Sequence, residues 1–473
     1  MPKLYHSRRP SRLFLPVCLL LSLLLICVLL LTHLFRPTVS PDPPTPLELP
    51  AHTWPFRVLR GQVADCTMGT LSVEDAQGRV HRFDRDGTPV AAGQSGLLIG
   101  ARVAVAYLDA PDRGVPARAL FAAVSQSPEP QPPPPTPEEI AESLLDSMTL
   151  EEKVGQMFIA RRPKGDAPGE AARWALGGYL LFTRDIRGQT PETLGAEIQA
   201  CQQAAGIPMF IGVDEEGGSV VRISKFPAFR AQPFPSPQEL WQAGGLTAVR
   251  EDAAEKSRLL RSLGFNLNFA PVCDVSQDPQ DYIYSRTLGL DGAQTADYVR
   301  AVVEEMSGQG MGCVLKHFPG YGGSRDTHTA VVRDDRPLEV FIQSDLLPFQ
   351  AGIEAGAGMV LVSHNIVSCM DSSLPASLSP RVHEILREDL GFQGVIVTDD
   401  LSMSGAADFA GTERAAVLAV LAGNDLLCTT DYQLQIPAVL QAVEAGEIPL
   451  SRIDQSVLRI LMLKLSLGLI PAP

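Results

Sequence analysis

Eight short apolar segments alternate with helical patterns along the C-terminal part of this chain, and this alternation restricts the fold more than any other feature. The apolar segments begin at Gly155, Gly177, Pro208, Phe265, Gly312, Gly358, Gly394 and Asn424. The intervening segments, such as PETLGAEIQACQQA and TADYVRAVVEEMSGQG, have helical periodicity, and several end in glycine just before the next apolar segment. Eight strands with intervening helices predict a (β/α)8 barrel, a TIM-type α/β fold, over residues 138–473. A doubly wound open sheet is the alternative, but it does not require eight strands.

The first 36 residues have the pattern of a membrane anchor rather than of a globular fold. Leu13 to Phe35 is an almost unbroken apolar run without a charged residue, long enough to span a hydrocarbon core of about 30 Å. The basic residues that precede it place the N-terminus in the cytoplasm. A cleaved signal peptide is the alternative, but it needs a shorter apolar core and an A-x-A-like site. We expect residues 1–36 to form a cytoplasmic tail and a single transmembrane helix in the inner membrane, with the catalytic domain facing the periplasm or the outside.

Two proline-rich segments, residues 37–54 and 126–137, are expected to be extended linkers. Between them, residues 55–125 contain short apolar runs that alternate or cluster and are interrupted by DAQGR and APDRGVP. This pattern predicts a small all-β domain, a barrel or a sandwich. No residue pattern in it indicates catalysis, so a structural module is expected, with a spacer or wall-binding role as the alternative.

Charge and cysteine usage exclude several classes of function. The formal net charge of −15 argues against a nucleic-acid partner, because a polyanion binds a basic surface. The eight cysteines are scattered and form no CxxC pair, which disfavours zinc and thioredoxin-like sites. We interpret them as small core residues rather than disulfides.

Titratable residues close most of the apolar segments, at the ends where a barrel carries its active site. They are Asp214, Asp274, Lys316, His317, His364, Asp399 and Asp400. Their convergence indicates an enzyme, since solubility alone would scatter them over helix surfaces. An alternative is that some only cap the following helix, which fits Asp274 and Asp400.

The residue types at these ends suit sugar chemistry. Barrel metallohydrolases commonly carry HxH on the first strand, and GQMFIARR has no such ligands, so we expect no metal and no other cofactor. Retaining glycoside cleavage needs a nucleophile and a proton donor, and the carboxylate of Asp399 in VIVTDDLSM can be the nucleophile. In KHFPGYGGSRDTHTA, Asp326 lies two residues before His328, and such a dyad can give a proton and take it back. The alternative for DTH is a turn that caps its own backbone.

These motifs match a known family. DEEGGSVVR, LGFNLNFAPVCDV, SRTLG, KHFPGYGGSRDTH, LVSHN and GVIVTDDLSM occur in the order seen in glycoside hydrolase family three. The resemblance covers Glu138 to Leu469 and is to the β-N-acetylglucosaminidase branch, bacterial enzymes that trim N-acetylglucosamine (GlcNAc) from muropeptides. It implies a retaining exo-β-N-acetylglucosaminidase that acts on cell-wall glycan or muropeptides through a covalent glycosyl-aspartate intermediate.

By position in these motifs, the resemblance implies a role for each site residue. Asp399 is implied as the nucleophile, His328 as the acid/base and Asp326 as its partner. The implied substrate-binding residues are Asp214, Arg222, Arg286, Lys316, His317 and Met403. The chain departs from the branch at Tyr321, where KHFPGHG has a histidine, which puts a neighbouring loop contact in doubt. It also departs in its expected tether, since the muropeptide-recycling enzymes of two-membrane bacteria are cytosolic.

Several readings of the function stay open at this point. They are a β-N-acetylglucosaminide phosphorylase, a β-glucosidase or xylosidase of the same family, and a membrane-anchored glycan-binding protein without activity. The partners expected are a GlcNAc-containing glycan and the membrane. The sequence does not give the aglycone, the oligomeric state or the role of the small β-domain.

Overall fold

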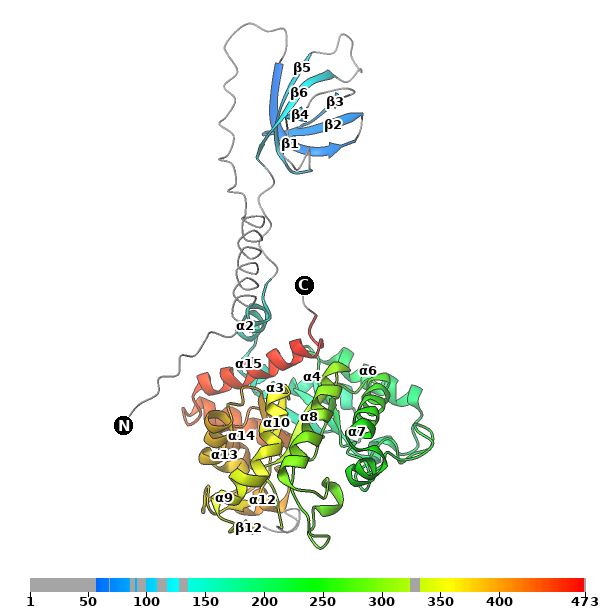
Figure 1. Cartoon of the computed structure of the whole chain (residues 1–473). Coiled ribbons are helices and arrows are strands. Elements are labelled where there is room, and N and C mark those ends of the chain that lie inside the picture. Colours follow the sequence, from blue (N-terminus) through cyan, green and yellow to red (C-terminus); the bar gives the residue numbers. More distant parts are fainter. Residues whose placement is uncertain are drawn as a thin grey trace, which may run out of the picture. The chain divides into compact units, whose positions relative to one another are not determined.

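The computed structural model describes residues 57–67, 69–85, 90–91, 99–108, 117–126, 135–323 and 332–471. Its contacts divide the chain into two compact units, Met1–Pro133 and Pro134–Pro473 (Figure 1). The expected anchor at residues 1–36 and the linker at 37–54 lie outside the described residues. Within the described ranges, no helix is both long enough and apolar enough to cross a membrane.

The second unit is built on a ring of parallel strands. The strands are β7 (Phe158–Arg161), β8 (Gly178–Leu181), β9 (Phe210–Val213), β10 (Leu267–Asn268), β11 (Gly312–Phe318), β13 (Met359–Val362), β15 (Val395–Thr398) and β16 (Leu427–Thr429). They are hydrogen-bonded in the order β15-β13-β11-β10-β9-β8-β7-β16, and a parallel bridge between Val397 and Leu426 joins the two ends. Each strand overlaps one predicted apolar segment, so the predicted (β/α)8 barrel is confirmed and the open sheet is wrong.

Helices surround this barrel, and several begin where the sequence supplies a cap. The longer ones are α2 (Pro137–Ser147), α3 (Leu150–Gln156), α4 (Ala167–Trp174), α6 (Pro191–Ala204), α7 (Pro237–Ser262), α8 (Gly292–Gly308), α10 (Leu346–Glu354), α13 (Thr412–Ala422), α14 (Tyr432–Glu444) and α15 (Leu450–Ser466). At the start of α2, α3 and α7, a Ser or Thr caps the backbone of a Glu three residues later, and that Glu caps in return. Figure 1 shows α8 and α10 side by side on the outside of the barrel.

Shorter elements occupy the connections. They are α5 (Thr183–Ile186), η1 (Tyr284–Arg286), β12 (Arg333–Asp334), α9 (Leu338–Val340), η2 (Phe341–Asp345), β14 (Ile366–Val367), η3 (Ala376–Leu378), α11 (Pro380–Glu384), η4 (Ile385–Asp389) and α12 (Ser404–Ala410). The helical pattern that begins at Pro337 is therefore not one regular helix, since a π-helical turn, η2, separates α9 from α10.

The core of this unit lies inside the barrel and between the strands and their helices. Every residue of β8, β9, β13 and β15 is buried, which explains why the sequence shows continuous apolar runs rather than alternation. Large side chains such as Phe210, Phe269 and Phe318 are fully buried. Burying each such side chain contributes roughly 1.5–3 kcal/mol to folding. Because these side chains pack on the strands, they hold the strands, and so the ends of the strands, in place.

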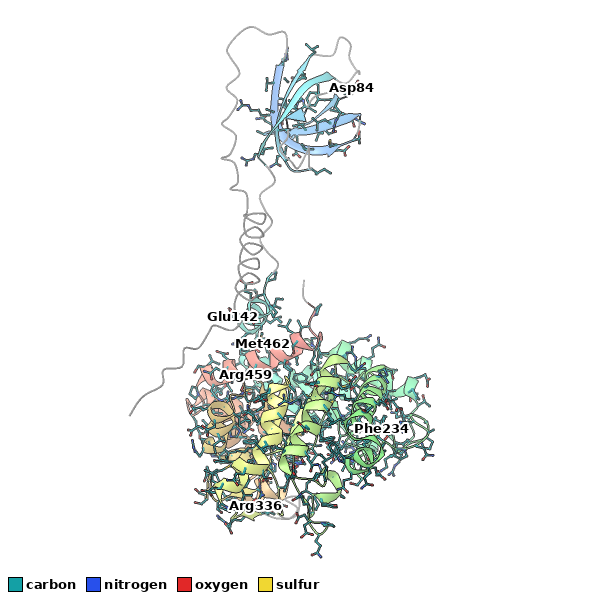
Figure 2. The ribbon with its side chains drawn as sticks, viewed as in Figure 1. Asp84, Glu142, Phe234, Arg336, Arg459 and Met462 are labelled. Carbon is teal, nitrogen blue, oxygen red and sulfur yellow. The ribbon has the colours of Figure 1, made fainter. Side chains whose placement is uncertain are left out.

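A buried ion cluster occupies the amino end of the barrel strands. Asp425, just before β16, is fully buried and accepts hydrogen bonds from Arg387, from Ser456 Oγ at 2.9 Å and from Arg459 at 3.1 Å. Figure 2 shows Arg459 and Arg336 at opposite ends of this unit. The amino end is thus closed by structural charges, and the carboxyl ends of the strands remain for function.

The first unit is a separate small β-structure. Its strands are β1 (Arg57–Cys66), β2 (Thr70–Asp75), β3 (Val80–Asp84), β4 (Val90–Ala91), β5 (Arg102–Leu108) and β6 (Ala117–Gln126). They pair in the order β3-β2-β1-β5-β6-β4, and a further pairing of β3 with β6 closes the ring. Val63, Val73, Phe83 and Val105 lie in its own core. Of the two predicted forms, the strands make a barrel.

Candidate active site

A cavity of about 500 Å³ opens at the carboxyl ends of the barrel strands. Seven of the predicted site residues line it: Asp214, Arg222, Arg286, Lys316, His317, Asp399 and Met403. They lie in or after four strands, β9, β10, β11 and β15, so residues far apart in the sequence converge because parallel strands end at one edge. The other two predicted residues, Asp326 and His328, lie outside the described residues.

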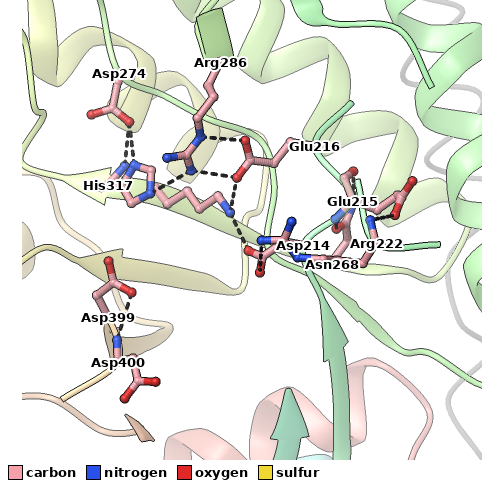
Figure 3. Close-up of polar contacts among 11 residues, drawn as sticks. Asp214, Glu215, Glu216, Arg222, Asn268, Asp274, Arg286, His317, Asp399 and Asp400 are labelled. Atoms are coloured by element: carbon pink, nitrogen blue, oxygen red, sulfur yellow. Dashed lines mark hydrogen bonds and ion pairs between the residues drawn. The ribbon is translucent and has the colours of Figure 1, made fainter. Parts of the chain in front are cut away.

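Lys316, in β11, connects two carboxylates in the wall of this cavity, those of Asp214 and Glu216, which Figure 3 labels. Its Nζ lies 2.8 Å from Asp214 Oδ1 and 2.6 Å from Glu216 Oε1. Arg286 binds the same glutamate in a bidentate manner, with Nε 2.9 Å from Oε2 and Nη2 2.8 Å from Oε1. Two cations and two carboxylates therefore form one charge-balanced network, which holds both cations in fixed positions.

Glu216 is a buried member of this network. Burial alone would raise its pKa, but the charges of Lys316 and Arg286 hold the pKa of Glu216 well below its ordinary range. For Arg286, burial alone would lower the pKa, because it disfavours the charged form. The pairing with Glu216 raises the pKa of Arg286 above its ordinary value instead. Glu216 thus stays ionised and offsets the cost of placing two cations beside a substrate cavity.

His317 is held from both sides. Arg286 Nη2 lies 3.2 Å from its Nε2, and Asp274 Oδ2 lies 2.7 Å from its Nδ1. A guanidinium can only donate, so Nε2 accepts and the Nδ1–H donates to Asp274, which defines a neutral imidazole with its proton on Nδ1. The carboxylate of Asp274 is fully buried and also accepts the backbone N–H groups of His317 and Tyr321, at 3.1 and 2.7 Å. Asp274 therefore orients His317 rather than capping a helix.

Asp399 follows β15 and is half-buried at the cavity wall. Its backbone N–H donates to Val362 O at 3.0 Å, and its Oδ1 accepts the N–H of Asp400 at 2.8 Å. The neighbouring Asp400 carboxylate accepts from Ser402 N at 2.9 Å and from Thr430 Oγ1 at 3.1 Å. Asp400 thus stabilises the turn after β15, in line with the alternative that it only caps the local backbone. Asp399 presents its carboxylate to the cavity.

His364 closes β13 but does not line the cavity. Its Nε2 donates to the carbonyl of Asp400 at 3.0 Å, so its Nδ1 accepts from Ser377 Oγ at 2.7 Å. The side chain is fully buried. His364 therefore supports the turn that carries Asp399 instead of reaching a ligand.

Glu215 and Glu216 were not singled out from the sequence, although both stand in DEEGG. Glu215 is fully buried and accepts the backbone N–H groups of Arg222, Ile223 and Ser224 at 2.8, 2.7 and 3.1 Å. It folds the loop after β9 and so positions Arg222. Three successive acidic residues directly after a buried strand were the available signal.

Tyr321, the departure from the branch pattern, lies beneath the site. Its side chain is buried, and its ring meets that of His317 edge to face, with 5.0 Å between the ring centroids. A tyrosine here packs against the imidazole, an aromatic contact worth about 0.5–1.5 kcal/mol. Apolar and aromatic side chains complete the cavity: Leu180, Phe182, Phe269, Tyr282 and Met403. Within the ranges described above, no group of three or more His, Cys, Asp or Glu is arranged to hold a metal ion.

A carboxylate and a set of fixed donors at the mouth of a (β/α)8 barrel define the polar binding cavity of a barrel enzyme. The model of the glycosyl hydrolase family 3 N-terminal domain matches residues 149–463. The chain therefore belongs to this family and is a glycoside hydrolase, as the sequence motifs predict.

Named relatives agree with this membership. β-Hexosaminidase LpqI of Mycobacterium tuberculosis is 33% identical over 328 residues, which are 66% of this chain and 82% of that protein. A β-hexosaminidase of Xanthomonas oryzae pv. oryzae is 36% identical over 285 residues, 58% of this chain and 82% of that protein. A solved family 3 β-N-acetylglucosaminidase from Paenibacillus superposes with a TM-score of 0.64 and 32% identity, covering 68% of this chain and 63% of that chain.

Proposed function

We propose that this chain is a retaining exo-β-N-acetylglucosaminidase in which Asp399 is the nucleophile and the Asp326–His328 dyad moves the proton. The observation that carries the proposal is the convergence of Asp399 with the Lys316–Arg286 network in one cavity. The names of the relatives, β-hexosaminidase and β-N-acetylglucosaminidase, support the choice of sugar.

In the first step, Asp399 attacks the anomeric carbon of the terminal sugar. The C–O bond to the leaving group breaks as the glycosyl ester forms, and His328 gives its proton to the leaving oxygen. Asp326 orients the ring of His328 and stabilises the imidazolium form that gives this proton and becomes neutral imidazole. The dyad enters this proposal through its sequence motif, since both residues lie outside the described ranges.

In the second step, water attacks the same carbon from the opposite face. His328 takes a proton from the water, the ester to Asp399 breaks, and the sugar leaves with the configuration it had in the substrate. Two inversions at one carbon restore the original configuration, which is why a nucleophilic carboxylate predicts retention.

The charge network is suited to holding the terminal sugar. Lys316 and Arg286 are donors fixed by Glu216, and Asp214 is a less buried acceptor for hydroxyl groups. A cavity of about 500 Å³ lies within the range of small-ligand pockets, which favours exo cleavage of one terminal residue. Phe269 and Met403 belong to the apolar part of the wall.

We further propose that the substrate is cell-wall glycan or muropeptide and that the catalytic unit acts outside the inner membrane, tethered by residues 1–36. The support is the apolar run from Leu13 to Phe35 with basic residues before it. Protease treatment of spheroplasts should digest the catalytic unit without lysis. Protection until lysis would contradict the tether and leave the enzymatic proposal intact.

The enzymatic proposal is tested with 4-nitrophenyl β-GlcNAc and, as a control, the matching β-glucoside. Release from the first and not from the second is expected. A 2-fluoro glycosyl fluoride should trap an ester on the peptide that contains Asp399. An adduct on another side chain, or full activity of Asp399→Ala, would reject the assignment of the nucleophile.

A further inference from the structure

Residues 324–331, which contain the proposed acid/base dyad, lie outside the described residues, but the chain on both sides of them is described. We call residues 324–331 the dyad segment. The chain enters it through residues 320–323, after β11, and leaves it through Val332 and β12. Figure 2 labels Arg336, shortly after β12, at the end of the second unit where β12 and α9 lie in Figure 1. Arg336 contacts both sides of the dyad segment.

On the side before the dyad segment, the guanidinium of Arg336 packs against the backbone of residues 320–323. Its Nη2 lies 3.5 Å from the carbonyl oxygen of Gly320, a long hydrogen bond. Gly322 has a φ of +50°, and a Cβ at this position would collide with the guanidinium carbon of Arg336. A Cβ on Gly320 would lie 2.8 Å from Asp345 Oδ1. The two glycines therefore let this backbone approach Arg336 and Asp345 closely.

On the side after the dyad segment, Arg336 binds Asp334 of β12. Its Nε lies 3.1 and 3.0 Å from the two carboxylate oxygens, its Nη2 lies 2.8 Å from Oδ2, and its backbone N–H donates to Oδ1 at 3.0 Å. Asp334 is itself fixed in the fold, because its carbonyl accepts the backbone N–H of Ser368 at 2.8 Å and β12 pairs with β14. The side chain of Arg336 thus connects the chain before the dyad segment with the chain after it.

Asp345, in η2, gives Arg336 a fixed support. Its Oδ1 accepts Arg336 Nη1 at 2.9 Å, and the guanidinium lies 4.4 Å from the ring centroid of Phe341. The carboxylates of Asp334 and Asp345 are both buried, and burial raises the pKa of Asp345 to about 6, although the charge of Arg336 acts in the opposite direction. Burial alone would lower the pKa of Arg336, but the hydrogen bonds to Asp334 and the charge of Asp345 raise it. We call Arg336, Asp334 and Asp345 the arginine clamp.

We propose that Arg336 is a positioning residue for the proposed acid/base, because the arginine clamp holds both sides of the dyad segment. Fixing the two ends of a segment restricts the conformations that it can take. The imidazole of His328 is then held closer to the position from which it can protonate the leaving oxygen. Arg336 does not line the candidate active-site cavity, so it acts through the dyad and not on the sugar. The inference rests on the proposed function, which assigns the proton transfer to the dyad.

The test compares leaving groups that differ in their need for a proton. A 2,4-dinitrophenolate leaves without protonation, whereas a phenolate leaves faster when an acid donates a proton. The kcat/KM of Arg336→Gln should fall at least about tenfold on phenyl β-GlcNAc and stay within about threefold of wild type on 2,4-dinitrophenyl β-GlcNAc. His328→Ala should show the same dependence on the leaving group, with a larger fall on the phenyl glycoside. Loss of a residue that only stabilised the fold would lower both values of kcat/KM together.

The matched control is Arg333→Gln. Arg333 also lies on β12, but its Nη1 binds Ser368 Oγ at 3.0 Å and the carbonyl of Ser372 at 3.1 Å, outside the arginine clamp. This variant should keep both values of kcat/KM near those of wild type. Gly322→Ala disturbs the clamp from its other side, because the added methyl group collides with the guanidinium of Arg336. It should reproduce the leaving-group dependence of Arg336→Gln, and it decides the proposal if Arg336→Gln does not fold.

The outcomes separate the proposal from the function on which it rests. Equal losses on the two glycosides in folded Arg336→Gln, or no loss on either, would overturn the proposal while the activity of wild-type enzyme upheld the proposed function. The same leaving-group dependence in Arg333→Gln would also overturn it, because the effect would not be specific to the arginine clamp. If wild-type enzyme hydrolyses neither glycoside, the proposed function fails, and the role of Arg336 in it fails as well.

Discussion

At the scale of single residues, the site depends on buried carboxylates that hold its cations and its imidazole in place. Glu216 neutralises Lys316 and Arg286, and Asp274 fixes the ring of His317. Neither carboxylate has to change its protonation state for the proposed chemistry. Their role is to hold donors and acceptors in fixed positions, which lowers the reorganisation needed when a sugar binds.

Replacing Glu216 by Gln should damage both stability and activity. The variant leaves two buried cations without their shared carboxylate, a change that typically costs about 3–5 kcal/mol. Because the folded-state pKa of Glu216 is depressed, its contribution should be complete above the ordinary carboxyl pKa and disappear as pH falls through the depressed value. Urea unfolding of wild type and variant should therefore differ equally at pH 6 and pH 8 and converge in strong acid.

The matched control is Glu255→Gln, which breaks the exposed Arg230–Glu255 pair with Nε–Oε1 at 2.9 Å. Exposed pairs contribute roughly 0–1 kcal/mol, so this variant should unfold near the wild-type midpoint. A Glu216→Gln variant as stable as Glu255→Gln would show that the network does not neutralise the site.

Asp274→Asn should change the tautomer of His317. An amide offers one acceptor oxygen in place of two, so it cannot accept from His317 Nδ1, His317 N and Tyr321 N together. Leaving a buried donor unpaired costs about 1–3 kcal/mol, and we expect kcat/KM for 4-nitrophenyl β-GlcNAc to fall roughly tenfold or more. Nitrogen-15 NMR of the imidazole measures the cause directly. Unchanged Nδ1 protonation in the variant would contradict the proposed role of Asp274.

At the scale of elements, the sequence predicts the strands well because both faces of a parallel barrel strand are buried. Hydrophobic runs mark the strands, and the titratable residue that ends a run marks the site, as Asp214, Lys316 and Asp399 do. The contacts between side chains of different elements cannot be predicted from such local patterns. Asp274 lies in the loop after β10 and His317 lies in β11, so no local pattern indicates that the two side chains meet.

Lys464 in α15 is a second example of a contact that the local sequence does not predict, because a lysine in a helix is normally expected to face solvent. Its side chain is fully buried, and its Nζ donates to Gln156 Oε1 in α3 at 2.7 Å and lies 5.1 Å from the ring centroid of Phe210. Burial lowers the pKa of Lys464 to about 7. Lys464 therefore connects α15 to α3, but its positive charge destabilises the folded state.

Lys464→Met should accordingly stabilise the unit in a pH-dependent manner. The folded-state pKa is depressed, so the unfolded state binds more protons between pH 7 and about pH 10.4, and wild-type stability falls as pH is lowered through this window. The gain from Lys464→Met should thus be larger at pH 6.5 than at pH 9.5, by about 1.4 kcal/mol for each pH unit within the window. Urea midpoints at the two pH values measure it, with the exposed Lys164→Met as control. An equal stabilisation by Lys464→Met at both pH values would contradict the lowered pKa of Lys464 in the folded state.

At the scale of the whole molecule, the chain combines two units that each have a core of their own. The core of the β-unit, around Val73 and Val105, is separate from that of the barrel. All seven described site residues belong to the barrel unit. The chemistry on a small substrate should then require the barrel unit alone, whereas the β-unit and the N-terminal segment can affect only where the enzyme acts and on which polymer.

A fragment of residues 135–473 tests this division. It retains α2 with its capping box at Thr136 and Glu139, so the first helix of the unit keeps its start. The fragment should hydrolyse 4-nitrophenyl β-GlcNAc with kcat/KM within about twofold of the full chain, because no described site residue is removed. Full chain and fragment are then compared on insoluble cell-wall glycan, where a loss confined to the polymer would assign the missing part to targeting. Loss of activity on the small glycoside, in a fragment whose circular dichroism shows a folded barrel, would mean that the β-unit completes the site, and the separation of chemistry from targeting would have to be abandoned.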